Sequence, residues 1–131
     1  MMKNLFQLTL ATLLTITSTV SMSADFDGSK PLICAPVEAI DCGVGVGCTK
    51  GVPDDIGAPN FMRIDFKKKV IVGPKRTTAI LFMDKTKEQL LLQGTELGFA
   101  WTFALDAQGK MTATLADRAG AFIMFGSCTP L

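Results

Sequence analysis

The stretch FAWTFALDAQGKMTATLA, residues 99–116, decides the fold class of this chain. Apolar side chains alternate with small or polar ones on both sides of the DAQGK segment. The DAQGK segment itself is typical of a turn, with Gly109 at positive φ. A period of two places alternate side chains on opposite faces of a strand. One face then carries Phe99, Trp101, Phe103 and Leu105 in the first strand, and Met111, Ala113 and Leu115 in the second. The stretch therefore predicts a β-hairpin.

The neighbouring segments repeat this rhythm. Residues 61–66 (FMRIDF) alternate cleanly, and three lysines separate them from a return strand at 70–72. Residues 77–83 and 88–94 flank a polar stretch, as the two arms of a hairpin do. The run AFIMFG, residues 121–126, is apolar on both faces, which favours a central place in the sheet or the closing of a barrel.

The segments before residue 61 are less regular. Residues 32–41 are apolar but interrupted by proline, which indicates an edge strand. Residues 49–60 are rich in Gly, Pro and Asp and are typical of a loop, with one helical turn beginning at Asp54. After residue 24, no segment shows a helical period of useful length. We therefore expect an all-β fold, an antiparallel meander of about eight short strands that forms a small barrel or a curled sheet.

The first 24 residues have the features of an export signal. Lys3 provides a positive charge, residues 5–20 are uncharged and mostly apolar, and small residues precede an acidic start at Asp25. We expect a signal helix over residues 1–24, cleaved after Ala24 or, as the alternative, after Ser23. The exported chain is then a single domain, residues 25–131, which is periplasmic or secreted by a bacterium.

The exported chain is electrically neutral. Removing residues 1–24 takes away one basic residue and leaves 12 basic and 12 acidic ones. No overall field then favours nucleic acid or an anionic membrane. No later segment is long and apolar enough to span a bilayer, so we expect no stable membrane insertion after cleavage.

The four cysteines predict two disulfides, because small exported domains commonly use such bonds to supplement a modest core. The segment CGVGVGC, residues 42–48, is short and rich in glycine and can turn back on itself. Cys34 lies in the first expected strand and Cys128 at the end of the last, so a bond between them ties the ends of the meander together. We favour Cys42–Cys48 with Cys34–Cys128, and the other two pairings stay open.

Other interpretations of the CGVGVGC segment fit the sequence less well. A zinc site usually pairs cysteines as C-x-x-C and often includes His, and the chain has neither. A phosphate-binding loop or a redox-active disulfide would precede a helix, and none is expected here. A copper site could use methionines, but these alternate within strand patterns as core residues do. They are Met62, Met83, Met111 and Met124. We expect no metal and no cofactor.

The chain is poor in catalytic side chains. It has no His and no Tyr, and its cysteines are expected to be oxidised. Its carboxylates are scattered over turns and outward strand positions. We therefore expect no catalytic residues, and an envelope enzyme that uses Glu38, Asp41 and Asp65 is the less favoured alternative.

Two groups of residues are candidates for binding. Phe99, Trp101 and Phe103 could line a pocket for a small hydrophobic ligand in a barrel, and the alternative is that they fill the core. Basic residues at two successive hairpin ends could form a rim that meets an acidic partner or anionic lipid head groups, or could only keep the strand ends soluble. These are Lys67, Lys68, Lys69, Lys75 and Arg76.

Three segments resemble a family of small exported bacterial proteins to which no function is assigned. They are FDGSKPLICAPVEAIDC (26–42), FMRIDFKKKVI (61–71) and GKMTATLADRAGAFIMFGSCTP (109–130). The resemblance implies a periplasmic protein of mostly β structure and transfers no catalytic or binding residue. In architecture the chain is similar to lipocalin-like and lysozyme-inhibitor-like barrels. We expect a non-enzymatic binding or interaction domain of unknown partner, with a carrier of a small hydrophobic ligand as the alternative.

Overall fold

A computed structural model describes residues 23–131 of the protein. The expected signal helix covers residues 1–24 and lies outside the described residues, apart from its last two positions. Within residues 23–131, no helix is long and apolar enough to cross a membrane.

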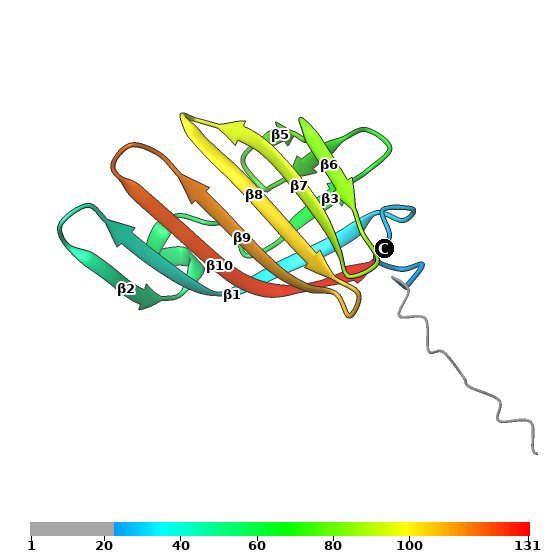
Figure 1. The fold of residues 1–131 in the computed structure, drawn as a ribbon, viewed down its shortest axis with the longest axis horizontal. Coiled ribbons are helices and arrows are strands. Elements are labelled where there is room, and N and C mark those ends of the chain that lie inside the picture. The colour runs from blue at the N-terminus through cyan, green and yellow to red at the C-terminus, as the bar shows by residue number, and fades with distance from the viewer. Residues whose placement is uncertain (1–22) are drawn as a thin grey trace, which may run out of the picture.

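The described chain forms one antiparallel sheet of ten β-strands and a short 3-10 helix (Figure 1). The elements are β1 (Leu32–Gly43), β2 (Gly47–Gly51), η1 (Pro53–Ile56), β3 (Met62–Asp65), β4 (Val70–Val72), β5 (Thr77–Ala79), β6 (Phe82–Lys85), β7 (Gln89–Glu96), β8 (Phe99–Asp106), β9 (Lys110–Ala116) and β10 (Gly120–Pro130). The strand order is β5-β4-β3-β1-β10-β9-β8-β7-β6, and β2 pairs with β1 outside this path. The sheet curls into a half-barrel, so the expected all-β fold is confirmed.

The first and last strands lie side by side in the middle of the sheet. β1 pairs with β10 along almost its whole length, and its other edge pairs with β3 and then with β2. β1 is therefore not an edge strand, contrary to the expectation from its prolines. Pro36 is accommodated because the register shifts between Pro36 and Glu38. A bulge of this kind tolerates a residue that cannot donate to the ladder.

The sheet has more strands than the sequence predicts, for two reasons. Residues 47–51 form β2 by pairing with the second half of β1, although most of them were expected in a loop. Residues 77–83, expected as one strand, divide into β5 and β6 because the chain changes partners. Ile80 N–H donates to Lys69 O beside β4, whereas Leu81 N–H donates to Gln93 O of β7. This change of partner brings the two ends of the strand order together.

The half-barrel has two ends, which we call the packed end and the open end. The packed end holds the turns at 66–69, 86–88 and 107–109 and the N-terminal segment 23–30. The open end holds the turns at 73–76 and 97–98. In Figure 1 the C terminus and the blue N-terminal segment lie together at the packed end, and the β1–β2 hairpin projects on the opposite side.

Cross-strand neighbours stack in three layers on the inner face of the sheet. Nearest the packed end are Leu90, Leu105 and Met111. The middle layer is Leu92, Phe103, Ala113 and Met124, and the layer nearest the open end is Gly94, Trp101, Leu115 and Phe122. Every residue of the first layer is at most 2% exposed, whereas Leu115 and Phe122 are only partly buried. The best-buried part of the core is therefore at the packed end.

The N-terminal segment covers the packed end. Phe26 packs against Gly109, where an added Cβ would stand 2.5 Å from Phe26 Cζ and 2.8 Å from the carbonyl oxygen of Cys128. Gly109 also has φ of 85°, a left-handed conformation that favours glycine. The β8–β9 turn thus needs glycine both for its backbone and for the close approach of Phe26.

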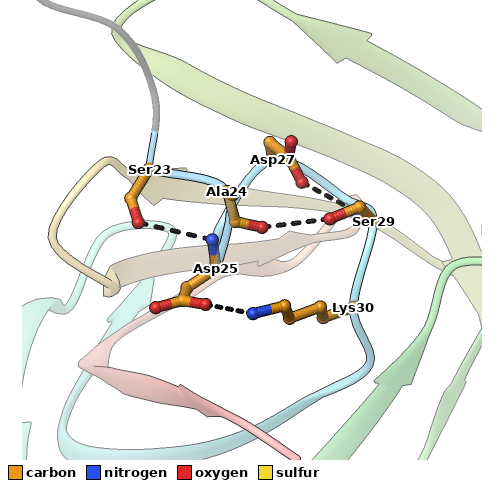
Figure 2. Close-up of polar contacts among 6 residues, drawn as sticks. All are labelled: Ser23, Ala24, Asp25, Asp27, Ser29 and Lys30. Atoms are coloured by element: carbon orange, nitrogen blue, oxygen red, sulfur yellow. Dashed lines mark hydrogen bonds and ion pairs between the residues drawn. The ribbon is translucent and has the colours of Figure 1, made fainter.

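Short polar contacts fix the shape of this segment (Figure 2). Lys30 Nζ lies 2.6 Å from Asp25 Oδ1, and Ser29 Oγ donates to Ala24 O at 3.0 Å. The Ser29 N–H donates to Asp27 Oδ1 at 2.9 Å. The Ser29 side chain, and after it the Ser29 N–H, lowers the pKa of Asp27 below its ordinary value. The hydrogen bond to Asp25 raises the pKa of Lys30.

Candidate functional site: a cavity at the open end

A cavity of about 340 Å³ lies at the open end of the half-barrel. Its wall is mostly apolar and comes from β8, β9 and β10, from single residues of β3, β4, β5 and β7, and from the end of η1 and the segment that follows it. Its wall includes Arg76, Glu96, Phe99, Trp101, Ala113 and Phe122.

Small residues make the room for this cavity. In the middle layer Ala113 stands between Phe103 and Met124, and nearer the open end Gly94 stands beside Trp101. The layer at the packed end has larger side chains at the corresponding positions of β7 and β9. Ligand sites are typically apolar hollows with a few polar groups in the wall, and this composition makes the cavity a candidate binding site.

Trp101 occupies the wall beside the seam where β5 meets β7. A Cβ added to Gly94 would stand 2.6 Å from Trp101 Cε2 and 2.7 Å from the carbonyl oxygen of Ala79. The indole edge therefore rests on the bare backbone of Gly94. Trp101 is 7% exposed, and its Nε1 is buried without a hydrogen-bond partner, the only such side-chain nitrogen or oxygen in residues 23–131.

Two phenyl rings stand near the mouth of the cavity. The ring centroids of Phe99 and Phe122 are 5.7 Å apart, with the planes tilted by 43°. This is within the range of favourable aromatic pairs. The pair joins β8 to β10 across β9 and makes part of the wall apolar, and Phe99 is also the cross-strand neighbour of Glu96.

The charged side of the mouth bridges the β5–β7 seam. Arg76, in the turn before β5, lies 3.7 Å from Glu96 at the end of β7, and both line the cavity. Deeper along the seam, Thr78 Oγ1 donates to Thr95 O at 3.2 Å. β5 and β7 form no ladder with each other. Among the described residues, this seam is thus the least hydrogen-bonded boundary between strands that adjoin around the half-barrel.

The structure places the residues named from the sequence as follows. Phe99, Trp101 and Phe103 all line the cavity. The five basic residues do not form one rim, because β4 runs between the two groups. Lys67, Lys68 and Lys69 occupy the β3–β4 turn at the packed end, and Lys75 and Arg76 the β4–β5 turn at the open end. Only Arg76 among them lines the cavity.

Both disulfides join residues directly opposite each other in neighbouring strands. Cys34 bonds to Cys128 between β1 and β10, and Cys42 bonds to Cys48 between β1 and β2. This is the pairing favoured from the sequence. The first bond is buried in the core, whereas the second closes the projecting β1–β2 hairpin, whose tip residues Val44 and Val46 are 79% and 84% exposed.

The candidate carboxylates do not converge on one site. Glu38 forms an ion pair with Lys50 at 2.8 Å, Asp65 accepts the Lys68 N–H at 2.9 Å in the β3–β4 turn, and Asp41 is exposed on β1. Residues 23–131 contain no group of three or more Cys, Asp or Glu side chains arranged to hold a metal ion. Of the four methionines, three are buried and Met83 is 47% exposed.

Several wall residues were not identified from the sequence. Ala113 and Phe122 reach the cavity through the register of β9 and β10. The wall also includes Ile56 and Pro59, from a segment expected as a loop with one helical turn, which the structure has as η1. Residues 121–126 are apolar on both faces, so the run alone does not distinguish Phe122 from Ile123 or Phe125. Nothing local signals the contribution of Ile56 and Pro59.

Comparison of the chain with protein-family models, curated proteins and solved structures finds no match.

Proposed function

We propose that the protein is an exported, non-enzymatic binding protein that takes up a small, mostly apolar ligand in the cavity at the open end. The cavity carries this proposal: it is lined by aromatic and aliphatic side chains, with a few polar groups near its mouth. Ligand sites typically have this composition and volumes of roughly 300–1,000 Å³. At about 340 Å³ the cavity suits a ligand at the small end of that range.

Two features support the other parts of the proposal. The disulfides suit an oxidising compartment such as the periplasm. The chain lacks His and Tyr, all four cysteines are in disulfides, and the candidate carboxylates lie apart, which supports a role in binding. Mass spectrometry of protein from the periplasm, without reductant, should give the mass of residues 25–131 less four hydrogens. A full-length mass or four free thiols would contradict export and oxidation.

Trp101 provides the direct test of ligand binding because it is the only tryptophan of the chain. Titration with a panel of small apolar probes should change its fluorescence saturably and raise the melting temperature. A ligand at 100 times its Kd stabilises a protein by about 2.7 kcal/mol. An unresponsive Trp101 and an unchanged melting temperature across the panel would overturn the proposal.

A matched pair of variants in β9 localises the binding. Ala113→Leu adds bulk inside the cavity, whereas Thr112→Leu adds bulk at the neighbouring position on the opposite face. The first variant should weaken binding at least tenfold, and the second should leave binding within about twofold. Equal losses would place the ligand elsewhere.

A protein partner is the second candidate, favoured by the β1–β2 hairpin tip. Val44 and Val46 are almost fully exposed there, and the Cys42–Cys48 bond and a hydrogen bond from Val44 N–H to Ala119 O hold the tip in place. Contiguous exposed apolar surface commonly marks a contact site. Val44→Asp with Val46→Asp should abolish any such complex and leave small-ligand binding intact. A complex that survives this double substitution would show that the tip is not the contact site.

A further inference from the structure

We propose that the ligand is a neutral, mostly apolar molecule with one hydrogen-bond acceptor, and that this acceptor binds the indole N–H of Trp101. The inference rests on the proposed function and specifies the chemistry of the molecule that the cavity takes. Its starting point is the unpartnered Nε1 atom in a residue of the cavity wall. Buried polar groups are nearly always hydrogen-bonded to protein or to ordered water, so the unpartnered Nε1 stands out in this wall. An indole N–H is a donor only, and the missing partner must therefore be an acceptor.

The other polar groups of the wall already have partners. Arg76 pairs with Glu96 at the mouth, Thr78 Oγ1 donates to Thr95 O, and Thr102 Oγ1 accepts from Gln93 Nε2 at 3.2 Å. The mouth carries one positive and one negative charge, and these cancel. A ligand with a net charge would gain attraction from one of the pair and repulsion from the other, so a neutral ligand fits this mouth better.

The position of Nε1 defines how a ligand reaches it. Nε1 is itself covered, because the indole edge rests on Gly94 next to the Ala79 carbonyl oxygen. This contact lies on the β5–β7 seam, which in the described residues is held by the Thr78–Thr95 and Leu81–Gln93 hydrogen bonds and the half-exposed Arg76–Glu96 pair. Exposed ion pairs contribute little to stability, so the Arg76–Glu96 pair holds the seam only weakly. A ligand oxygen in the cavity can accept this N–H only if the strands part slightly at the open end of the seam, and the inference includes this movement.

Acetophenone and cumene form a suitable pair of probes. They have the same number of heavy atoms and the same phenyl ring, and the carbonyl oxygen of acetophenone replaces one methyl group of cumene. Binding can be followed by NMR on the methyl groups of Met62 and Met124, which line the cavity. The single indole N–H resonance of the chain reports on Trp101 directly.

Acetophenone should shift the indole proton downfield and slow its exchange with solvent, and cumene should do neither. In Trp101→Phe, which keeps an aromatic ring without the donor, the affinity for acetophenone relative to cumene should fall about fivefold, the size of one ordinary hydrogen bond. Phe99→Leu alters the same wall without touching the donor. It should change both affinities in the same proportion, within about twofold.

The outcomes separate this inference from the proposed function. If the wild-type protein binds neither probe, the proposed function fails at this ligand size and the inference fails with it. If both probes bind but move the indole proton alike, or if Trp101→Phe leaves their affinity ratio unchanged, the inference alone is overturned. A melting temperature of Trp101→Phe within a few degrees of the wild type confirms that the variant is folded for the comparison.

Discussion

The two ends of the half-barrel are built from the same strands but are filled differently. At the packed end, Leu90, Leu105 and Met111 are almost fully buried, and Phe26 covers them from the N-terminal segment. At the open end the same strands carry Gly94 and Trp101, and a cavity of about 340 Å³ remains between them and the β3–β5 strands. The contrast indicates that the packed end supplies most of the stability, whereas the open end leaves the room that the proposed ligand would occupy.

The two disulfides also differ in burial and in the length of chain that they close. Cys34–Cys128 spans 94 residues and lies in the core, whereas Cys42–Cys48 spans 6 residues and lies in the projecting hairpin. A bond that closes a long loop restricts the unfolded chain far more than one that closes a short loop. The buried Cys34–Cys128 bond should therefore stabilise the fold more than the Cys42–Cys48 bond of the exposed hairpin.

The largest expected effect is the loss of the core disulfide. Cys34→Ala with Cys128→Ala should lower the free energy of unfolding by about 4–5 kcal/mol, and Cys42→Ala with Cys48→Ala by about 2 kcal/mol, from the loop-length dependence of the entropy. Urea denaturation of the two double variants measures the difference. Failure of the first variant to fold agrees with the larger effect, and equal losses would break the comparison.

A matched pair of leucines tests the packing contrast next. Leu105→Ala at the packed end should cost about 3 kcal/mol, because it leaves a closed cavity in a well-packed layer. Leu115→Ala at the open end should cost about 1 kcal/mol, since it only enlarges an existing cavity and removes a partly buried side chain. Thermal or urea unfolding measures both losses. A larger loss for Leu115→Ala than for Leu105→Ala would show that the open end contributes more to stability than the packed end.

The strand pattern was predictable where local alternation decides structure. Residues 99–116 have the predicted hairpin and the predicted inner face. A shift of one residue in the strand pairing would turn the apolar side chains to solvent, so the alternation specifies the register. The run 121–126 does become a central strand, between β1 and β9. The Cys34–Cys128 pairing also followed from the expected meeting of the first and last strands.

Features that depend on a second partner strand were not predictable. Residues 77–83 look like one apolar strand, and nothing in the run shows that Ile80 bonds toward β4 while Leu81 bonds to β7. The prolines of β1 suggested an edge, yet a bulge at Pro36 allows pairing on both sides. The cavity was predictable only through its aromatic residues, because Gly94 and Ala113 matter through the register that places them beside large neighbours.

Gly94 offers a smaller effect at the open end. Gly94→Ala would bring a Cβ within 2.6 Å of Trp101 Cε2 and 2.7 Å of Ala79 O, so the indole or the seam must move. Such overpacking should cost about 1–3 kcal/mol and shift the Trp101 emission to longer wavelength. Gly73→Ala, also at the open end, meets only the Arg76 carbonyl oxygen at 3.4 Å and the Pro59 side chain at 4.0 Å. It should alter neither stability nor emission appreciably. Equal effects of Gly94→Ala and Gly73→Ala would show that the close contact between Gly94 and Trp101 is not important.

The smallest expected effect is a pH dependence confined to the N-terminal segment. Because the folded state lowers the pKa of Asp27, its carboxylate stabilises the fold above the ordinary pKa of 3.8, and this stabilisation is lost as the pH falls through the lower, folded-state pKa. Asp27→Asn should therefore lower the melting temperature slightly at pH 6, and the difference from the wild type should vanish at strongly acidic pH.

Ser29→Ala tests the cause of this shift, because the Ser29 side chain is the largest contribution to it. In that background the pH dependence of the Asp27→Asn difference should shrink. A difference that instead grows toward acidic pH would mean that the carboxylate is destabilising at the packed end. Ligand affinity at neutral pH should be the same in both variants, since the segment and the cavity lie at opposite ends of the half-barrel; a change in affinity would show that the two ends are coupled.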